Sequence, residues 1–184
     1  IMDKKDKTER NRLYGLVKKY MALGSGELGE LPRTLEDVRA LYDQLVLDEV
    51  VNEDGENRPD GRYFRQQKVF VKDQYGKIIH EGAMPEVRIN DLMQRMLEII
   101  HDPFFSWIER GAICHYMIGY IHPFYDGNGR LNRYLLSAMI HKELSILVAY
   151  HLSYEIKNNR ATYYRLFSET NLELNKGDLT PFVL

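Results

Sequence analysis

The spacing of hydrophobic residues predicts a mostly helical chain. In several stretches, apolar side chains recur every three or four positions, which is the period of a helix with one buried face. Thr34 precedes one of these stretches as a natural N-cap, and Gly24 interrupts another. We expect helices at residues 8–23, 34–50, 86–100, 103–121, 127–141 and 158–172.

A single β-hairpin is the other predicted element. Two short runs, 68–71 and 77–80, contain β-branched and aromatic residues and flank a turn that includes Gly76. Glycine can adopt the positive φ that such a turn requires. The polar segment 52–61 holds neither period and is predicted to be a loop. The pattern therefore describes a bundle of about six to eight helices with one protruding hairpin.

Length and composition favour one domain. The 184 residues are 44% hydrophobic, which is enough for one substantial core. Basic and acidic residues are interleaved and the formal net charge is −2, so nothing points to a nucleic-acid partner. No apolar run suits a membrane span and no signal segment is visible, so we expect a cytoplasmic protein, with a secreted effector as the alternative. The single cysteine, Cys114, excludes an intrachain disulfide.

The residues with the most distinctive chemistry lie in one short segment. His122 can act as a general base, and the glycine-flanked start of the next helix can direct backbone N–H groups at an anion. Asp126 supplies one carboxylate, and one carboxylate with phosphate oxygens is a usual way to hold Mg²⁺. Arg130 and Arg133 lie three positions apart on one face of the predicted helix, and each can bind phosphate oxygens. Together these groups predict a nucleotide phosphate site.

The same segment resembles the signature of Fic domains. The family pattern is His-Pro-Phe-x-Asp-Gly-Asn-Gly-Arg-x-x-Arg, and residues 122–133 satisfy every defined position. Such a pattern in its helical context is far more specific than a lone glycine motif. The resemblance covers nearly all of residues 34–184 and implies the Fic fold for a core with those bounds. We expect one Fic domain over 1–184, with an N-terminal helix and linker at 1–33.

The resemblance implies transfer of AMP from ATP to a Tyr, Thr or Ser hydroxyl of a target protein, with release of pyrophosphate. His122 would deprotonate the target hydroxyl, and Asp126 would hold Mg²⁺ against the α and β phosphates. Backbone amides and the asparagine would form the anion hole, and the two arginines would bind the β and γ phosphates. The phosphate-binding residues expected in this way are Gly127, Asn128, Gly129, Arg130 and Arg133.

Two further sites are implied by the resemblance. Tyr163, Tyr164 and Asn171 occupy positions where similar proteins contact the adenosine. The hairpin corresponds to the family's flap, which binds an extended segment of the target protein by adding it as a strand. The flap residues are Lys68, Val69, Phe70, Val71, Ile78, Ile79 and His80.

Several alternatives stay open. Doc-like proteins resemble Fic domains but transfer the γ phosphate, and they typically carry lysine where this chain has Gly129. Another nucleotide donor, removal of AMP, or a catalytically silent nucleotide-binding module would also fit the motif. His115 and His122 lie seven positions apart, but no third ligand completes a zinc site. Tyr163 and Tyr164 can also be read as core aromatics.

Regulation is a separate question. Many Fic proteins are inhibited by a helix of the form Ser/Thr-x-x-x-Glu-Gly/Asn, whose glutamate pairs with the second motif arginine, here Arg133. No segment of this sequence has that spacing. Because Ile1 precedes Met2 and the sequence stops in the apolar run 181–184, we expect a fragment of a longer chain. An inhibitory helix would then come from a missing segment or from a partner protein. The pattern gives no indication of oligomeric state.

Overall fold

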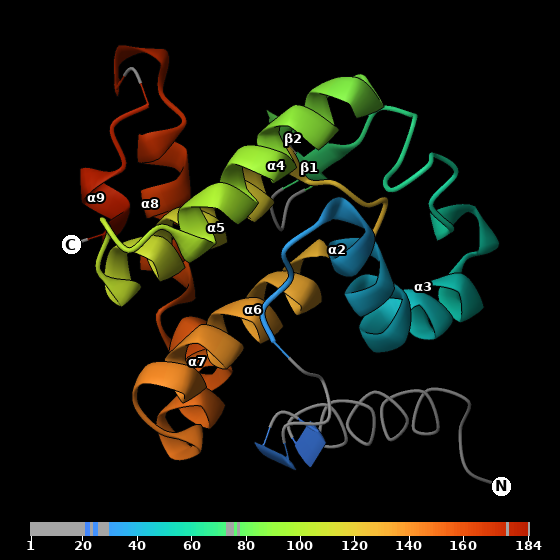
Figure 1. Ribbon diagram of the computed structural model, residues 1–184. Coiled ribbons are helices and arrows are strands. Elements are labelled where there is room, and N and C mark those ends of the chain that lie inside the picture. Colours follow the sequence, from blue (N-terminus) through green and yellow to red (C-terminus); the bar gives the residue numbers. More distant parts are fainter. Residues whose placement is uncertain are drawn as a thin grey trace, which may run out of the picture.

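The computed structural model is mostly helical with one two-stranded antiparallel hairpin (Figure 1). It describes residues 21–22, 24–25, 30–72, 76, 78–175 and 177–183, so most of the predicted helix at 8–23 lies outside the described residues. The helices are α2 (Leu35–Tyr42), α3 (Asp48–Glu53), α4 (Glu86–His101), α5 (Trp107–Ile121), α6 (Asn128–Glu143), α7 (Ile146–Asn158), α8 (Arg160–Thr170) and α9 (Thr180–Val183). The strands are β1 (Phe70–Lys72) and β2 (Ile78–Glu81).

The helices begin where side chains can satisfy their first backbone N–H groups. Thr34 caps α2 as predicted, because its Oγ1 accepts a hydrogen bond from the Asp37 N–H at 3.1 Å. Ser106 and Glu109 form the equivalent capping box at the start of α5. Helix α6 instead follows Gly127, whose φ of 79° is readily adopted only by glycine. The start of α6 therefore has no side-chain cap.

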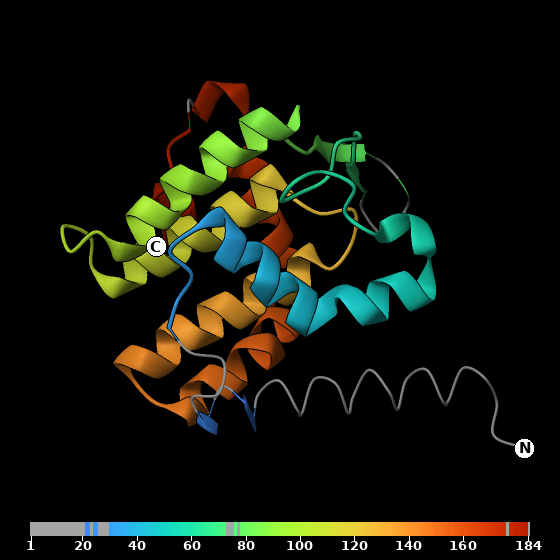
Figure 2. The same ribbon diagram turned by 45° about the vertical axis from the view of Figure 1, so that its right-hand side comes forward.

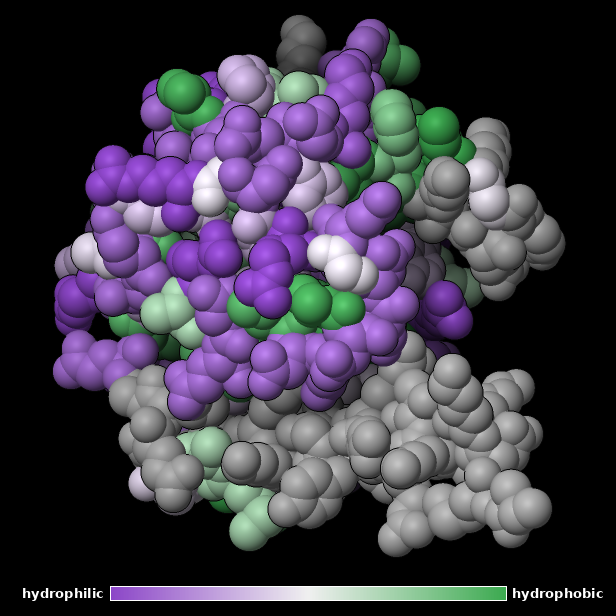
Figure 3. All heavy atoms as spheres, turned by 90° about the vertical axis from the view of Figure 1, so that its right-hand side faces the viewer, coloured by the Kyte–Doolittle hydropathy of each residue, from purple (hydrophilic) through white to green (hydrophobic). Residues whose placement is uncertain are grey.

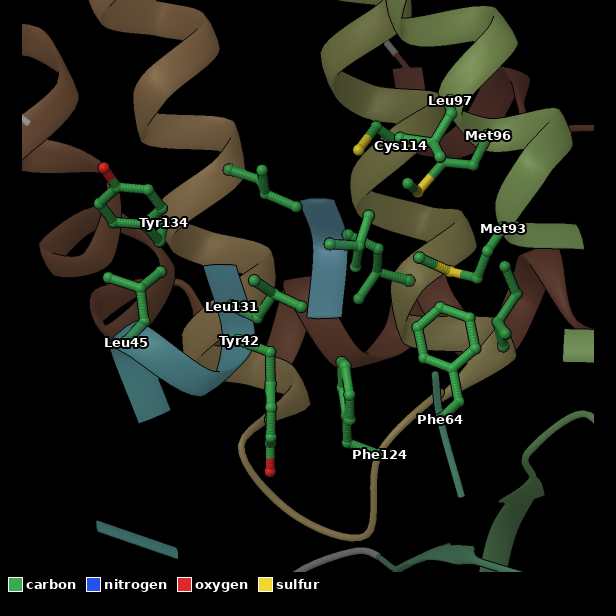
Figure 4. Close-up of a cluster of buried hydrophobic side chains, with 14 of the residues drawn as sticks. Tyr42, Leu45, Phe64, Met93, Met96, Leu97, Cys114, Phe124, Leu131 and Tyr134 are labelled. Atoms are coloured by element: carbon green, nitrogen blue, oxygen red, sulfur yellow. The ribbon is translucent and has the colours of Figure 1, made fainter. Parts of the chain in front are cut away.

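The central helices enclose the core and anchor the motif loop in it. Helix α5 packs between α4 and α6, and α7 packs on α6 (Figures 1 and 2). Between α5 and α6, the buried Phe124 ring stacks on Tyr42, with ring centroids 3.6 Å apart. Phe64 meets Phe124 edge to face at 5.4 Å, and Figure 4 shows the three rings together. The loop between α5 and α6 is thus fixed by aromatic packing.

The hairpin lies beside the end of α5, and its strands are shifted from the predicted runs. The strands begin and end later than predicted, at 70–72 and 78–81 rather than 68–71 and 77–80. An irregularity in register follows Val71, which pairs with His80, whereas Lys72 pairs with Ile78. Gly76 has the expected positive φ, at 81°. A bulge of this kind redirects side chains, so neighbouring residues can face the same side.

Two helical predictions need correction. The predicted helix at 34–50 is divided by a π-helical turn, Asp43–Leu47, and continues to Glu53. No helix was predicted at 146–158, where α7 lies. Only Ala149 is buried on α7, while Leu147 and Tyr154 are 69% and 59% exposed. Because apolar residues occupy several faces of this helix, the one-sided pattern that reveals a helix is missing.

Little of the visible surface is apolar. The face on the α3 side of the molecule is largely hydrophilic, with small hydrophobic areas (Figure 3). Among the described residues, none of the helices combines the length and apolar character needed to span a bilayer.

Candidate active site

His122 ends α5 in an unusual backbone conformation. Its φ of 51° and ψ of 61° are left-handed, and no other described residue except glycine has a positive φ. Its backbone N–H still donates to the Ile118 carbonyl at 3.0 Å. A left-handed residue with a side chain costs about 1 kcal/mol or more, so neighbouring groups must stabilise it. The turn at His122 directs the chain from α5 into the motif loop.

Arg65 holds the carbonyl of this histidine. The Arg65 side chain is fully buried, and its Nε donates to the His122 carbonyl at 2.8 Å. Its other nitrogens donate to the carbonyls of Gln67 at 2.5 Å and Ala83 at 2.8 Å. These two carbonyls lie before β1 and after β2. One guanidinium therefore joins the hairpin to the end of α5.

The side chain of Asn128 closes the motif loop. Its Oδ1 accepts a hydrogen bond from the Phe124 N–H at 2.9 Å, and its Nδ2 donates to the Phe124 carbonyl at 2.8 Å. The side chain is 3% exposed. Both ends of the amide are thus occupied within the loop. The contribution of Asn128 to an anion hole is left to its backbone N–H.

The loop is also tied to the segment before the hairpin. The Tyr125 hydroxyl donates to Asp60 Oδ1 at 2.7 Å and accepts a hydrogen bond from the Gln67 N–H at 3.0 Å. Asp60 Oδ1 accepts a further bond from the Gln66 N–H at 2.9 Å. Residues 60–67 therefore brace the loop that carries the motif.

The first turn of α6 offers unpaired backbone donors. The Gly127 N–H donates to Asp126 Oδ1 at 2.5 Å. The N–H groups of Asn128 and Gly129 have no acceptor in the described part of the chain. At a helix N-terminus such donors, together with the helix dipole, attract an anion. Gly129 is exposed, so an anion can approach it directly.

The two motif arginines have different surroundings. Arg130 donates to Glu49 Oε2 at 2.7 Å and to Asp126 Oδ2 at 3.3 Å. Arg133 is half-buried and forms no ion pair with any residue the structure describes. Residues three positions apart are neighbours on a helix, yet only Arg133 lines the cavity described below. Only Arg133 is available for a phosphate group without first giving up a carboxylate.

A cavity of about 170 Å³ lies between the hairpin, α5, α6 and α8. It contains His122, Asn128, Gly129 and Arg133 of the motif and all three predicted adenosine contacts. Asp126, Gly127 and Arg130 are outside its lining, as are Lys68, Val69, Phe70 and Ile78 of the predicted flap. The residues that line it are Val71, Ile79, His80, Gly119, His122, Asn128, Gly129, Asn132, Arg133, Tyr163, Tyr164, Phe167, Ser168 and Asn171.

The imidazole of His122 is neutral in this cavity. Burial lowers the pKa of its imidazole to about 4, and the nearby Arg65 and His80 act in the same direction. Its Nδ1 lies 3.4 Å from the Gly119 carbonyl oxygen. We assign the proton to Nδ1 from this contact, which leaves Nε2 as a proton acceptor. At neutral pH the histidine can therefore accept a proton.

The predicted adenosine contacts are partly committed to other groups. The Tyr163 hydroxyl lies 2.8 Å from His115 Nε2, and burial raises the pKa of that phenol. Asn171 Oδ1 accepts a hydrogen bond from the Tyr116 hydroxyl at 2.5 Å. Tyr164 is 45% exposed. These residues form one wall of the cavity, and their rings offer a surface on which a base can stack.

The described acidic residues do not form a complete metal site by themselves. No group of three His, Cys, Asp or Glu residues among those described is arranged to hold a metal ion. The Asp126 side chain is 46% exposed, next to the open N–H groups of α6. A carboxylate placed there suits Mg²⁺ that takes its remaining ligands from phosphate oxygens and water. His115 is buried with its pKa lowered to about 4, mainly by burial, as expected for a packed histidine.

Sequence reasoning missed several residues of the site. Arg65 and Glu49 were assigned no role, although they hold His122 and Arg130. Both lie far from the motif in sequence. Arg65 belongs to a segment, 61–65, that resembles Fic domains, but only the fold shows that either residue contacts the motif. Gly119, Asn132, Phe167 and Ser168 also line the cavity without having been predicted to do so.

The fold and site define a mostly helical domain in which a neutral histidine shares one cavity with a helix N-terminus and with an arginine that has no ion pair among the described residues. The profile of the Fic/DOC family matches residues 32–140, more than half of the sequence. The chain belongs to the Fic/DOC family.

Named relatives and solved structures agree with this membership. The chain is 25% identical over 183 residues to "Protein adenylyltransferase Fic" of Drosophila sechellia and of Drosophila melanogaster, covering 99% of this chain and 33% of each relative. It therefore spans about a third of the length of these curated relatives. A Fic family protein from Desulfovibrio desulfuricans G20 shares the fold with a TM-score of 0.72 and 22% identity, over 100% of this chain and 50% of that one. Fic-1 from C. elegans gives a TM-score of 0.59 at 23% identity, over 100% and 49%.

Proposed function

We propose that this domain transfers AMP from ATP to a hydroxyl side chain of a target protein. The observation that carries the proposal is the cavity, which brings His122 together with the open N–H groups of α6 and with Arg133. The relatives named protein adenylyltransferase support the same chemistry. The expected acceptor is a Tyr, Thr or Ser hydroxyl that lies beside His122, which removes its proton.

The residues have distinct roles in the proposed reaction. The target hydroxyl oxygen attacks the α phosphorus while its proton passes to His122 Nε2, and the bond from phosphorus to the pyrophosphate oxygen breaks. The N–H groups of Asn128 and Gly129 stabilise the charge that develops on the α phosphate. Arg133 binds the terminal phosphates and aligns the leaving group with the attacking oxygen. The rings of Tyr163 and Tyr164 receive the adenine.

Asp126 is the residue that would hold Mg²⁺. The ion neutralises phosphate charge when it is bound with ATP. Arg130 then keeps Glu49 as its partner, because its shorter contact is to that residue, at 2.7 Å rather than 3.3 Å. The main role of Arg130 is therefore to stabilise the motif loop, and phosphate binding is its secondary role.

Gly129 favours AMP transfer over γ-phosphate transfer. A Cβ atom on this residue would lie 3.1 Å from Arg133 Nη1. A lysine there would place a second cation against that guanidinium and occupy the space where phosphates meet the helix. Glycine leaves both the space and Arg133 free, as the AMP-transfer orientation requires.

The hairpin is proposed to dock the target as an added strand. Val71, Ile79 and His80 face the cavity, so a strand paired with the hairpin passes close to His122. Main-chain pairing sets the register of the target hydroxyl without demanding a particular target sequence. Arg133 is open to an inhibitory glutamate from another segment or from a partner protein.

A panel of nucleotide donors tests the proposed function. The purified protein is incubated with source-cell lysate, Mg²⁺ and ATP, GTP, UTP or CTP, each labelled at the α phosphate, and the proteins are separated on denaturing gels. We expect label from ATP, and none with the His122→Ala variant. Label from UTP or CTP alone would show that the domain uses a donor other than ATP. Binding of ATP without labelled protein would favour a silent nucleotide-binding module.

A further inference from the structure

Arg65 is buried and forms no ion pair among the described residues, although Asp60 and Glu81 act on its charge from a longer distance. Its side chain is 0% exposed, and burial lowers the pKa of its guanidinium. Among the described residues, its hydrogen bonds all go to backbone carbonyl oxygens. Burying a charged group costs free energy, and its hydrogen bonds to these carbonyls must offset that cost.

The contacts of this guanidinium fall in two sets. One set is at the two ends of the hairpin, where the Gln67 and Ala83 carbonyls lie 2.5 and 2.8 Å away. The other is at the end of α5, where the His122 carbonyl lies 2.8 Å and the Ile121 carbonyl 3.5 Å away. Because His122 is left-handed, its carbonyl points away from the axis of α5, and Arg65 donates a hydrogen bond to it.

Gly82 lets the hairpin approach closely enough for this arrangement. A Cβ atom at Gly82 would lie 2.5 Å from Arg65 Nη2 and 3.1 Å from His122 Cβ. Next to it, the Ala83 N–H donates to the Ile121 carbonyl at 3.0 Å. The end of β2, the guanidinium and the histidine are therefore in direct contact.

We propose that Arg65 is a positioning residue that couples the flap to His122, holding the left-handed backbone that points the imidazole into the cavity. It touches neither the nucleotide nor the target hydroxyl and acts through the His122 carbonyl. The same guanidinium binds both ends of the hairpin and the His122 carbonyl. Arg65 therefore fixes the position of the hairpin, to which the target strand is added, relative to the histidine that deprotonates the target hydroxyl. The proposal rests on the function proposed above.

The test compares Arg65→Met and Arg65→Lys with Arg110→Met. Arg110 is the control. Its side chain is 23% exposed and, like that of Arg65, donates to a helix carbonyl, that of Ile100 at 3.3 Å. This hydrogen bond and the Arg110 ion pair with Glu143 at 3.8 Å involve neither the hairpin nor His122. For each variant we would measure the labelling rate with α-labelled ATP, the ATP concentration for half-maximal rate, and the NMR signals of the His122 ring. Gly82→Ala, which crowds the same contact, gives an independent perturbation.

We expect both Arg65 variants to lower the labelling rate at saturating ATP by about 10- to 100-fold, with the half-saturating ATP concentration changed by less than about twofold. The His122 ring signals should move in the Arg65 and Gly82 variants and stay in place in Arg110→Met. Folded Arg65 variants with unshifted ring signals and a rate within about twofold of the parent would overturn the proposal. If the parent protein labels nothing, the proposed function fails, and the ring signals still decide whether Arg65 positions His122.

Discussion

Replacing Asn128 with alanine tests whether this side chain is a clamp of the motif loop. The change removes an acceptor 2.9 Å from the Phe124 N–H and a donor 2.8 Å from the Phe124 carbonyl. Asn128 is 3% exposed, so water does not readily replace the lost partners. Each buried backbone group left unpaired costs about 1–3 kcal/mol, and the two together about 2–6 kcal/mol. Domains of this size are stable by about 5–15 kcal/mol, so the loss is measurable.

Asn132→Ala is the matched control for this measurement. Asn132 lies on the same helix and is also 3% exposed, but it donates only one hydrogen bond, to the His115 carbonyl at 2.7 Å, and its Oδ1 is already unpaired. We expect urea unfolding to show a loss for Asn128→Ala that exceeds the control by about 1 kcal/mol or more. Equal losses of unfolding free energy in the two variants would contradict the proposed role of Asn128 in closing the loop. A loss of ATP affinity in Asn128→Ala without a loss of stability would also contradict it and would indicate that the side chain belongs to the anion hole.

Three further predictions concern charge and space. Burial lowers the pKa of His122 and of His115 to about 4, against 6.5 in the unfolded chain, so the unfolded chain binds more protons between these pH values. The free energy of unfolding should therefore fall as the pH drops from 6.5 toward 4, by up to about 3 kcal/mol for each histidine. Urea unfolding across this range checks it: we expect a shallower pH dependence for His122→Ala, and a flat profile for the parent would contradict the prediction. Glu49→Gln weakens the ion pair with Arg130, so we expect a higher Mg²⁺ concentration for half-maximal ATP binding, because Arg130 then competes for the metal-binding carboxylate; unchanged Mg²⁺ dependence would argue against it. Gly129→Lys should lower ATP affinity and α-label transfer by at least about tenfold without loss of folding, measured by calorimetry and labelling, whereas normal affinity would show that the phosphates lie elsewhere.

The motif was readable from sequence because its parts are adjacent. His122, Gly129 and Arg133 carry their chemistry within one loop and one helical turn, and helical spacing predicts how they are presented. Of the predicted adenosine residues, Tyr163 and Tyr164 lie on α8 and Asn171 is its C-cap, and the structure brings all three to the same cavity. Their hydrogen bonds to His115 and Tyr116 depend on packing between α5 and α8, which no local pattern encodes.

The support of the motif was not readable from sequence. Arg65 lies 57 positions from His122 and Glu49 lies 81 positions from Arg130. At such a distance the sequence does not show that the arginine or the glutamate contacts the motif, and only the fold does. The two arginines of the motif show the same limit, because their spacing alone does not distinguish them. In the structure Arg130 pairs with Glu49, whereas Arg133 lines the cavity. Helix α7 was missed because its apolar residues do not lie on one face.

The central claim is that His122 drives transfer of the α phosphate, and paired labelling tests it most directly. Parent protein and His122→Ala are each incubated with Mg²⁺, source-cell lysate and ATP labelled at either the α or the γ position. The account predicts protein label from α-labelled ATP only, and its loss in the variant. Label from γ-labelled ATP on protein, or α label that persists in His122→Ala, would contradict it.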